Sequence, residues 1–93
     1  MKIQKNIKIY GKVQGVGYRY WLKTFAIKYE IYGWVKNNLG GEVEAVLIGQ
    51  AEEVTNLIEL CYMGSPDSNV EKIIVNNWND QYDVHSFKII SDN

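Results

Sequence analysis

Two kinds of hydrophobic spacing meet near the start of this chain, and a short segment with two glycines separates them. Residues 4–13 end in a run that alternates apolar and polar side chains, as a strand with one covered face does. Residues 18–30 repeat apolar side chains every three or four positions, as a helix with one buried stripe does. Gly15 and Gly17 allow the sharp turn needed between them. We therefore expect a strand, a tight loop and a helix, in that order.

The rest of the chain repeats these signals. Residues 31–37 are rich in β-branched and aromatic side chains and residues 42–48 alternate again, so the two segments predict a hairpin. A second helical stripe follows Gly49 and is expected to end at Gly64. Two further strands are expected, over residues 70–78 and 85–90. The predicted order is βαββαβ with a short terminal strand.

That order most simply gives an α+β fold, the ferredoxin-like α/β sandwich, with an antiparallel sheet and both helices on one face. The first and third strands are then central. Strands one and two run in the same direction with strand three between them, so their C-terminal ends lie at the same edge of the sheet. We therefore expect the glycine loop to be a neighbour of Asn37, the last residue of the second strand.

The glycine loop has the features of an anion site. Its backbone N–H groups are followed by a helix, whose first turn carries a partial positive charge of about half a unit. Arg19 has the wrong sign for that position, a mismatch that typically costs about 0.3–1 kcal/mol. A bound phosphate would compensate it. A surface arginine and ordinary turn glycines are the plainer interpretation of the same residues.

Composition narrows the function classes. The 93 residues are 46% hydrophobic, which predicts one small globular domain over residues 1–93. A net charge of −1 argues against general binding of DNA or RNA. Cys61 is the only cysteine, no leader opens the chain, and no apolar run is long enough to span a membrane. A cytoplasmic protein with no membrane contact is expected.

Two blocks of sequence together resemble the acylphosphatase family. They are the segment from Gly11 to Arg19 (GKVQGVGYR) and the segment from Gly33 to Asn37 (GWVKN), followed by Gly41-Glu-Val-Glu-Ala45. The resemblance implies hydrolysis of small acyl phosphates to a carboxylate and inorganic phosphate, with no metal or cofactor. It implies a small-molecule substrate and a monomer. Acetyl, carbamoyl and aryl acyl phosphates all fit these motifs.

The resemblance also assigns roles to residues of this chain. Arg19 and Asn37 match the family's essential arginine and asparagine, and both are expected to be catalytic. The substrate phosphate is expected to bind at the loop, through the following residues: Gly15, Val16, Gly17, Tyr18 and Arg19. The Arg19 fork suits two phosphate oxygens, and the Asn37 amide would orient the attacking water.

Three positions depart from the family pattern. Lys36 replaces an arginine and keeps the charge without the fork. Glu30 stands where a glycine often ends the first helix, so a left-handed conformation there would carry about 1 kcal/mol of strain. Tyr18 replaces a phenylalanine, and its ring is expected to be buried, although its hydroxyl could instead reach the pocket edge.

Two other functions remain open at this point. An RNA-recognition module shares the βαββαβ order but needs exposed aromatic rings on its central strands. Here Tyr10 would lie beside Glu42 and Glu44, which would repel a phosphate backbone and are expected to pair with Lys8 and Lys12. The second alternative is a non-catalytic module that binds a small phosphorylated ligand on the same fold. Release of inorganic phosphate from acetyl or benzoyl phosphate separates that alternative from an enzyme.

Two side chains that invite a catalytic role are expected to be structural. His85, the only histidine, falls on the expected terminal strand and outside both motifs. Cys61 lies on the apolar stripe of the second helix, where a packed thiol is more common than a nucleophile.

Overall fold

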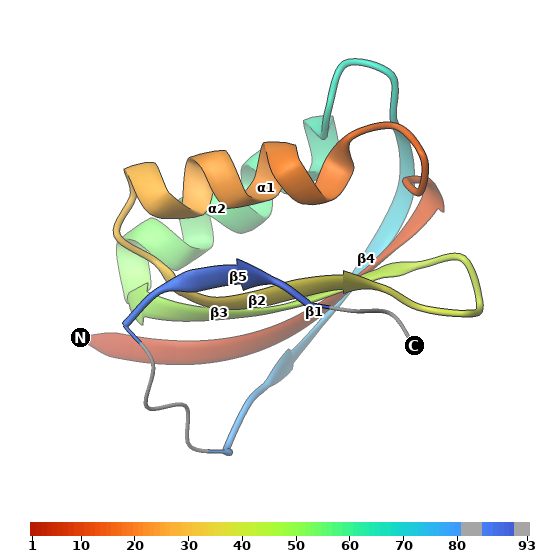
Figure 1. Ribbon diagram of the computed structural model, residues 1–93. Helices are drawn as coiled ribbons and strands as arrows, with labels where there is room; N and C mark the ends of the chain where they lie inside the picture. Colours follow the sequence, from red (N-terminus) through yellow and green to blue (C-terminus); the bar gives the residue numbers. More distant parts are fainter. Residues whose placement is uncertain (81–84, 91–93) are drawn as a thin grey trace.

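A computed structural model describes residues 1–80 and 85–90 of the chain. Two helices lie side by side on one face of a five-stranded sheet, and neither helix of these described ranges lies over the opposite face (Figure 1). The elements follow the expected order: β1 (Lys2–Lys12), α1 (Tyr18–Lys28), β2 (Tyr32–Asn37), β3 (Val43–Gln50), α2 (Ala51–Met63), β4 (Asn69–Asn77) and β5 (Phe87–Ile89). The predicted ferredoxin-like α+β architecture is confirmed.

The strand order across the sheet is β4-β1-β3-β2-β5. As predicted, β1 and β3 are central, and β3 pairs antiparallel with both β1 and β2. The expectation of a wholly antiparallel sheet is wrong at one edge, because β5 pairs parallel to β2. A strand that returns from the end where β4 finishes must run opposite to β4, and β2 also runs opposite to β4. The sheet is therefore mixed.

The core lies between the sheet and the helices. Its strand residues include Ile7, Ile9 and Leu47, each fully buried. The apolar stripes predicted for the two helices supply the other half of the core, through Leu22 and Ala26 of α1 and Val54, Leu57 and Cys61 of α2. The buried side chains of β1 therefore pack against the apolar stripes of the two helices, and this packing fixes how each helix lies on the sheet.

Helix α1 ends at Lys28, two residues earlier than expected, in a Schellman motif. The N–H of Glu30 donates to the C=O of Ile27 at 3.1 Å, and the N–H of Ile31 donates to the C=O of Ala26 at 2.8 Å. Glu30 has a φ of 57°, the only positive φ among the described non-glycine residues. Glu30 thus adopts the left-handed conformation whose strain the sequence analysis considered.

The other element ends lie within two residues of their expected positions. The first strand starts at Lys2 rather than Gln4, and the terminal strand is limited to three residues, so His85 precedes it instead of lying on it. The described residues include no helix long and apolar enough to cross a membrane.

Candidate active site

The loop between β1 and α1 is an open glycine turn. Gly15 and Gly17 have φ values of 75° and 77°, a region that favours glycine. A Cβ atom built on either residue would meet no atom within 4 Å, so the space beside the loop is unfilled. Gly17 is also the N-cap residue of α1 and, having no side chain, makes no side-chain cap.

The first turn of α1 is electropositive. Its first backbone hydrogen bond runs from the Trp21 N–H to the C=O of Gly17, at 3.0 Å, so the preceding N–H groups of the turn are not part of the helical ladder. The turn contains no acidic residue. Arg19, which is half-buried, adds a full positive charge there. Together the dipole and the guanidinium favour an anion.

Two hydrogen bonds attach this loop and turn to the end of α2. Ser65 Oγ donates to the C=O of Val16 at 2.9 Å, and the Tyr18 hydroxyl donates to the C=O of Cys61 at 2.6 Å. The Tyr18 side chain is only 1% exposed, so its hydroxyl does not reach the pocket edge and the expectation of a buried ring is confirmed. Desolvation raises the pKa of Tyr18 well above its ordinary value. Tyr18 can therefore offer an anion only its backbone N–H.

Asn37 is the last residue of β2 and lies opposite Val43 of β3. Its side chain is 9% exposed, and its Oδ1 is buried without a hydrogen-bond partner. A buried acceptor without a partner costs about 1–3 kcal/mol, so structures rarely keep one unless it has another use. Ser86 Oγ, in the segment that enters β5, is the other buried side-chain atom without a partner among the described residues, so Asn37 Oδ1 is the one at the glycine-loop end of the sheet.

The glycine loop and the turn after Asn37 lie at the same end of the sheet, to the right in Figure 1. The Gln14 side chain joins them: its Nε2 donates to the C=O of Asn38 at 2.8 Å and to the C=O of Glu42 at 3.0 Å. The structure thus brings together the two motifs that sequence reasoning paired. Gln14 itself was missed as a contributor, although it lies inside the first motif.

A network of hydrogen bonds between side-chain amides and the Glu44 carboxylate supports the β2–β3 turn. Glu44 accepts hydrogen bonds from Nδ2 of Asn38 at 3.0 Å and Nδ2 of Asn6 at 2.8 Å. Desolvation acts to raise the pKa of Glu44, but these two hydrogen bonds, with the charges of Lys8 and Lys36, lower it below its ordinary value. The expectation that the glutamates pair with Lys8 and Lys12 is therefore corrected for Glu44. Side-chain amides supply its hydrogen bonds, and the second lysine whose charge acts on it is Lys36 rather than Lys12.

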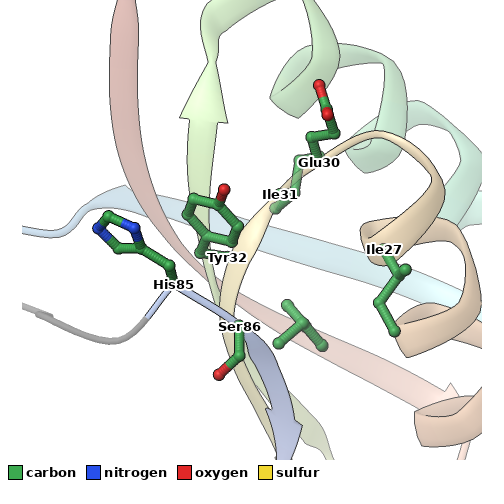
Figure 2. A pocket seen from close by; sticks show the side chains of 7 residues that line it. Ile27, Glu30, Ile31, Tyr32, His85 and Ser86 are labelled. Atoms are coloured by element: carbon green, nitrogen blue, oxygen red, sulfur yellow. The ribbon is translucent and has the colours of Figure 1, made fainter.

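The remaining chemistry-bearing side chains lie elsewhere. A hollow of about 240 Å³ lies between the end of α1, the start of β2 and the segment that enters β5. Figure 2 shows side chains that line it, Ser86 among them. Neither Arg19 nor Asn37 lines it. His85 stacks there on Tyr32, with ring centroids 5.3 Å apart, which is consistent with the structural role expected for this histidine.

Two further observations concern nucleophiles and metals. Cys61 is fully buried, and desolvation raises the pKa of its thiol to about 12, as suits the packed thiol predicted from the sequence. The described ranges, 1–80 and 85–90, hold no group of three or more His, Cys, Asp or Glu side chains that could bind a metal ion.

The layered fold, with an open glycine turn and the end of β2 at the same edge of its sheet, defines a small α+β domain with a candidate anion site. A sequence model of the family named acylphosphatase matches residues 5–89. An acylphosphatase of Thermococcus kodakarensis is 36% identical over 96% of this chain and 97% of its own length. An acylphosphatase of Rhizorhabdus wittichii is 43% identical over 80% of this chain and 75% of its own.

The solved structures agree with the sequences. A crystal structure of acylphosphatase from Bacillus subtilis superposes with a TM-score of 0.90 at 37% identity, covering 97% of this chain and 99% of that one. This chain belongs to the acylphosphatase family. It is an enzyme that hydrolyses acyl phosphates, and its substrate is accordingly a small acyl phosphate.

Proposed function

We propose that the glycine loop holds the phosphoryl group of the substrate and that Asn37 directs the attacking water. The backbone N–H groups of residues 15–19 and the guanidinium of Arg19 bind the phosphate oxygens. Asn37 Oδ1 accepts a hydrogen bond from the water, which turns a lone pair of that water toward phosphorus. The observation that carries this proposal is the buried Oδ1 of Asn37, which has no partner in the protein.

The reaction is a single displacement. The water oxygen forms a bond to phosphorus while the bond between phosphorus and the carboxyl oxygen breaks in line with it. The electron pair of the broken bond stays on the carboxylate. The water proton passes to an oxygen of the substrate's own phosphoryl group. The products are the free carboxylate and inorganic phosphate.

A protein acid or base is not required by this chemistry, because a carboxylate is weakly basic and leaves without protonation. The contribution of the protein is positioning and charge: the loop and Arg19 neutralise the equatorial oxygens, and Asn37 places the nucleophile. Loss of one such donor commonly costs about 10²–10³ in rate. The proposed mechanism therefore needs neither a metal nor a cofactor.

The surroundings of the reaction are also part of the proposal. We expect a monomer that acts in the cytoplasm on small acyl phosphates, with no nucleic-acid or membrane partner. The net charge of −1 supports a local anion site rather than a surface for polyanions. Gel filtration tests whether the protein is a monomer. An RNA-binding assay at several salt concentrations tests whether it binds nucleic acid.

The central experiment measures phosphate release from acetyl and benzoyl phosphate, without added metal, by the wild type and by Arg19→Lys and Asn37→Ala. Arg19→Lys should lose at least about 10²-fold in kcat/KM, because a lysine cannot bind two oxygens with a fixed fork. Asn37→Ala should lose about 10²–10³-fold in kcat while inhibition by inorganic phosphate changes little. Asn56→Ala, which removes an exposed amide of α2, is the matched control and should keep wild-type activity.

Two outcomes would contradict the proposal. Full activity in both site variants would remove Arg19 and Asn37 from the mechanism even though hydrolysis occurs. Binding of phosphate without turnover by the wild type would instead indicate the non-catalytic module.

A further inference from the structure

We infer that Gln14 is a positioning residue, which fixes the phosphate-binding loop relative to the Asn37 end of β2. The inference rests on the proposed function, because it assumes that the loop and Asn37 act on the same substrate. Gln14 does not need to contact the substrate for this role. Its side chain is turned instead toward the turn between β2 and β3.

Gln14 holds the β2–β3 turn through two hydrogen bonds from its side-chain amide, which we call the Gln14 clamp. Both hydrogen bonds leave one atom, Gln14 Nε2, and both end on backbone carbonyls, of Asn38 at 2.8 Å and of Glu42 at 3.0 Å. The same two residues are joined by their backbones, since the Asn38 N–H donates to the C=O of Glu42 at 2.8 Å. Gln14 therefore holds the base of the turn, immediately after Asn37, where Asn38 and Glu42 are hydrogen-bonded to each other.

The opposite side of the loop is fixed separately. Ser65 holds the C=O of Val16, and Tyr18 holds the end of α2, so the loop is attached to the helical layer by other side chains. Among the side-chain hydrogen bonds of the described residues, those from Gln14 are the ones that tie the loop to the β2–β3 turn. Loss of Gln14 would leave the loop attached to α2 and free to shift against Asn37.

This arrangement predicts a particular kinetic signature. Phosphate affinity depends on the loop and Arg19, which stay intact when Gln14 is changed. Turnover depends on the distance between the bound phosphorus and the water held by Asn37, and a displacement of about 1 Å can cost about 10²-fold in rate. A change at Gln14 should therefore lower kcat and spare the inhibition constant of inorganic phosphate.

The test compares Gln14→Met with Gln4→Met. Gln4 offers a matched control, because its Nε2 also donates to two backbone carbonyls, of Trp78 at 2.9 Å and Asp80 at 3.1 Å, away from the site. Both variants lose the same number of hydrogen bonds to the same kind of acceptor. Gln14→Asn, which keeps the amide but is one methylene shorter, is the second variant at the site.

We expect Gln14→Met and Gln14→Asn to lose about 10–100-fold in kcat with acetyl phosphate, while the inhibition constant for inorganic phosphate stays within about threefold. Gln4→Met should keep wild-type kcat even if its melting temperature falls by a similar amount. Equal kcat values in Gln14→Met and Gln4→Met would overturn the inference.

Three other results would also overturn it. One is a loss of phosphate inhibition in proportion to kcat, which would place Gln14 in the anion site. Another is Gln14→Asn with unchanged kcat. The third is failure of both Gln14 variants to fold while Gln4→Met folds, which would make Gln14 a structural residue. Retention of activity by Arg19→Lys and Asn37→Ala would instead contradict the proposed function, so the two failures are distinguishable.

Discussion

The hydroxyl of Tyr18 reaches the C=O of Cys61 across 2.6 Å and so ties the first turn of α1 to the last turn of α2. Gly64 makes room for this contact, because a Cβ atom there would lie 2.8 Å from Cε2 of the Tyr18 ring. The carbonyls in the last turn of a helix lack intrahelical partners, so Tyr18 satisfies a group that would otherwise be buried without one. The hydroxyl of Tyr18 therefore serves stability.

We predict that Tyr18→Phe lowers the free energy of unfolding by about 1–2 kcal/mol, because it leaves the buried Cys61 carbonyl without a donor. The kcat/KM should stay within about twofold of wild type, since the backbone N–H of residue 18 remains. Urea denaturation and phosphate release measure the two effects. Tyr20→Phe is the control, because Tyr20 is 68% exposed and should change neither quantity. Equal stability of the two variants would argue against the role of the hydroxyl.

Glu30→Gly should raise the free energy of unfolding by about 1 kcal/mol. The residue has a φ of 57°, which strains any side chain with a Cβ, and its charge lies beyond the negative end of the α1 dipole. A melting temperature higher by about 4–8 °C is expected for a domain of this size. Glu30→Gln keeps the strain and removes the charge, so calorimetry on both variants separates the two terms. Activity should not change in either.

Two glycines with positive φ should respond differently to alanine. At Gly33 a Cβ would lie 1.9 Å from the C=O of Val46 on the neighbouring strand, so Gly33→Ala should fold poorly or not at all. At Gly17 a Cβ meets nothing within 4 Å, so Gly17→Ala should fold, at a cost of about 1–2 kcal/mol in backbone strain.

The methyl group of Gly17→Ala would project into the space beside the loop, so the variant should bind inorganic phosphate more weakly. Circular dichroism and inhibition by phosphate measure both glycine variants. Wild-type phosphate inhibition in a folded Gly17→Ala would show that this space is not used.

Asn37→Ala should not destabilise the protein, although it removes a 91% buried side chain, because the buried Oδ1 of Asn37 is a cost in the absence of substrate. Denaturant unfolding should give a stability equal to or above that of the wild type, within about 1 kcal/mol. A variant that is as stable as the wild type and inactive would fit a residue kept for function. A loss of several kcal/mol would mean that the amide has a structural partner instead.

Acid should weaken the β2–β3 turn through Glu44, whose pKa is lowered from the ordinary value of 4.5. A lowered pKa gives stability that is fully present above the ordinary value and is lost as the pH falls through the folded-state pKa. We therefore expect wild type to exceed Glu44→Gln in stability at pH 7, and the difference to shrink below about pH 4.5. Urea unfolding between pH 7 and 3 measures this.

The order of the elements followed from the sequence because it depends on local spacing. Alternation in β1 and three-to-four spacing in α1 and α2 each specify an element and the face it buries. The direction of β5 did not follow, since three residues from Phe87 to Ile89 carry no signal about which neighbour they pair with. That choice depends on the path of the chain after β4.

The candidate site was predicted as a pair of motifs but not as a set of contacts. Arg19 and Asn37 were recognisable by type and by the strand order that places their segments at one edge. The Gln14 clamp and the network around Glu44 depend on the register of β3 with its two neighbours, which composition and spacing do not determine. The lack of a hydrogen-bond partner for Asn37 Oδ1 likewise depends on how the side chains pack.

Strand β3 pairs on one side with the strand that precedes the glycine loop and on the other with the strand that ends at Asn37. Strand β3 is the link between these two strands, so the glycine loop and Asn37 take their relative positions only when both pairings of β3 have formed. Substrate recognition therefore requires the three strands β1, β3 and β2 to be paired. A phosphate ion that binds there would report that these three strands are paired, and a chain in which they are not paired would be inactive even with both of its motifs intact.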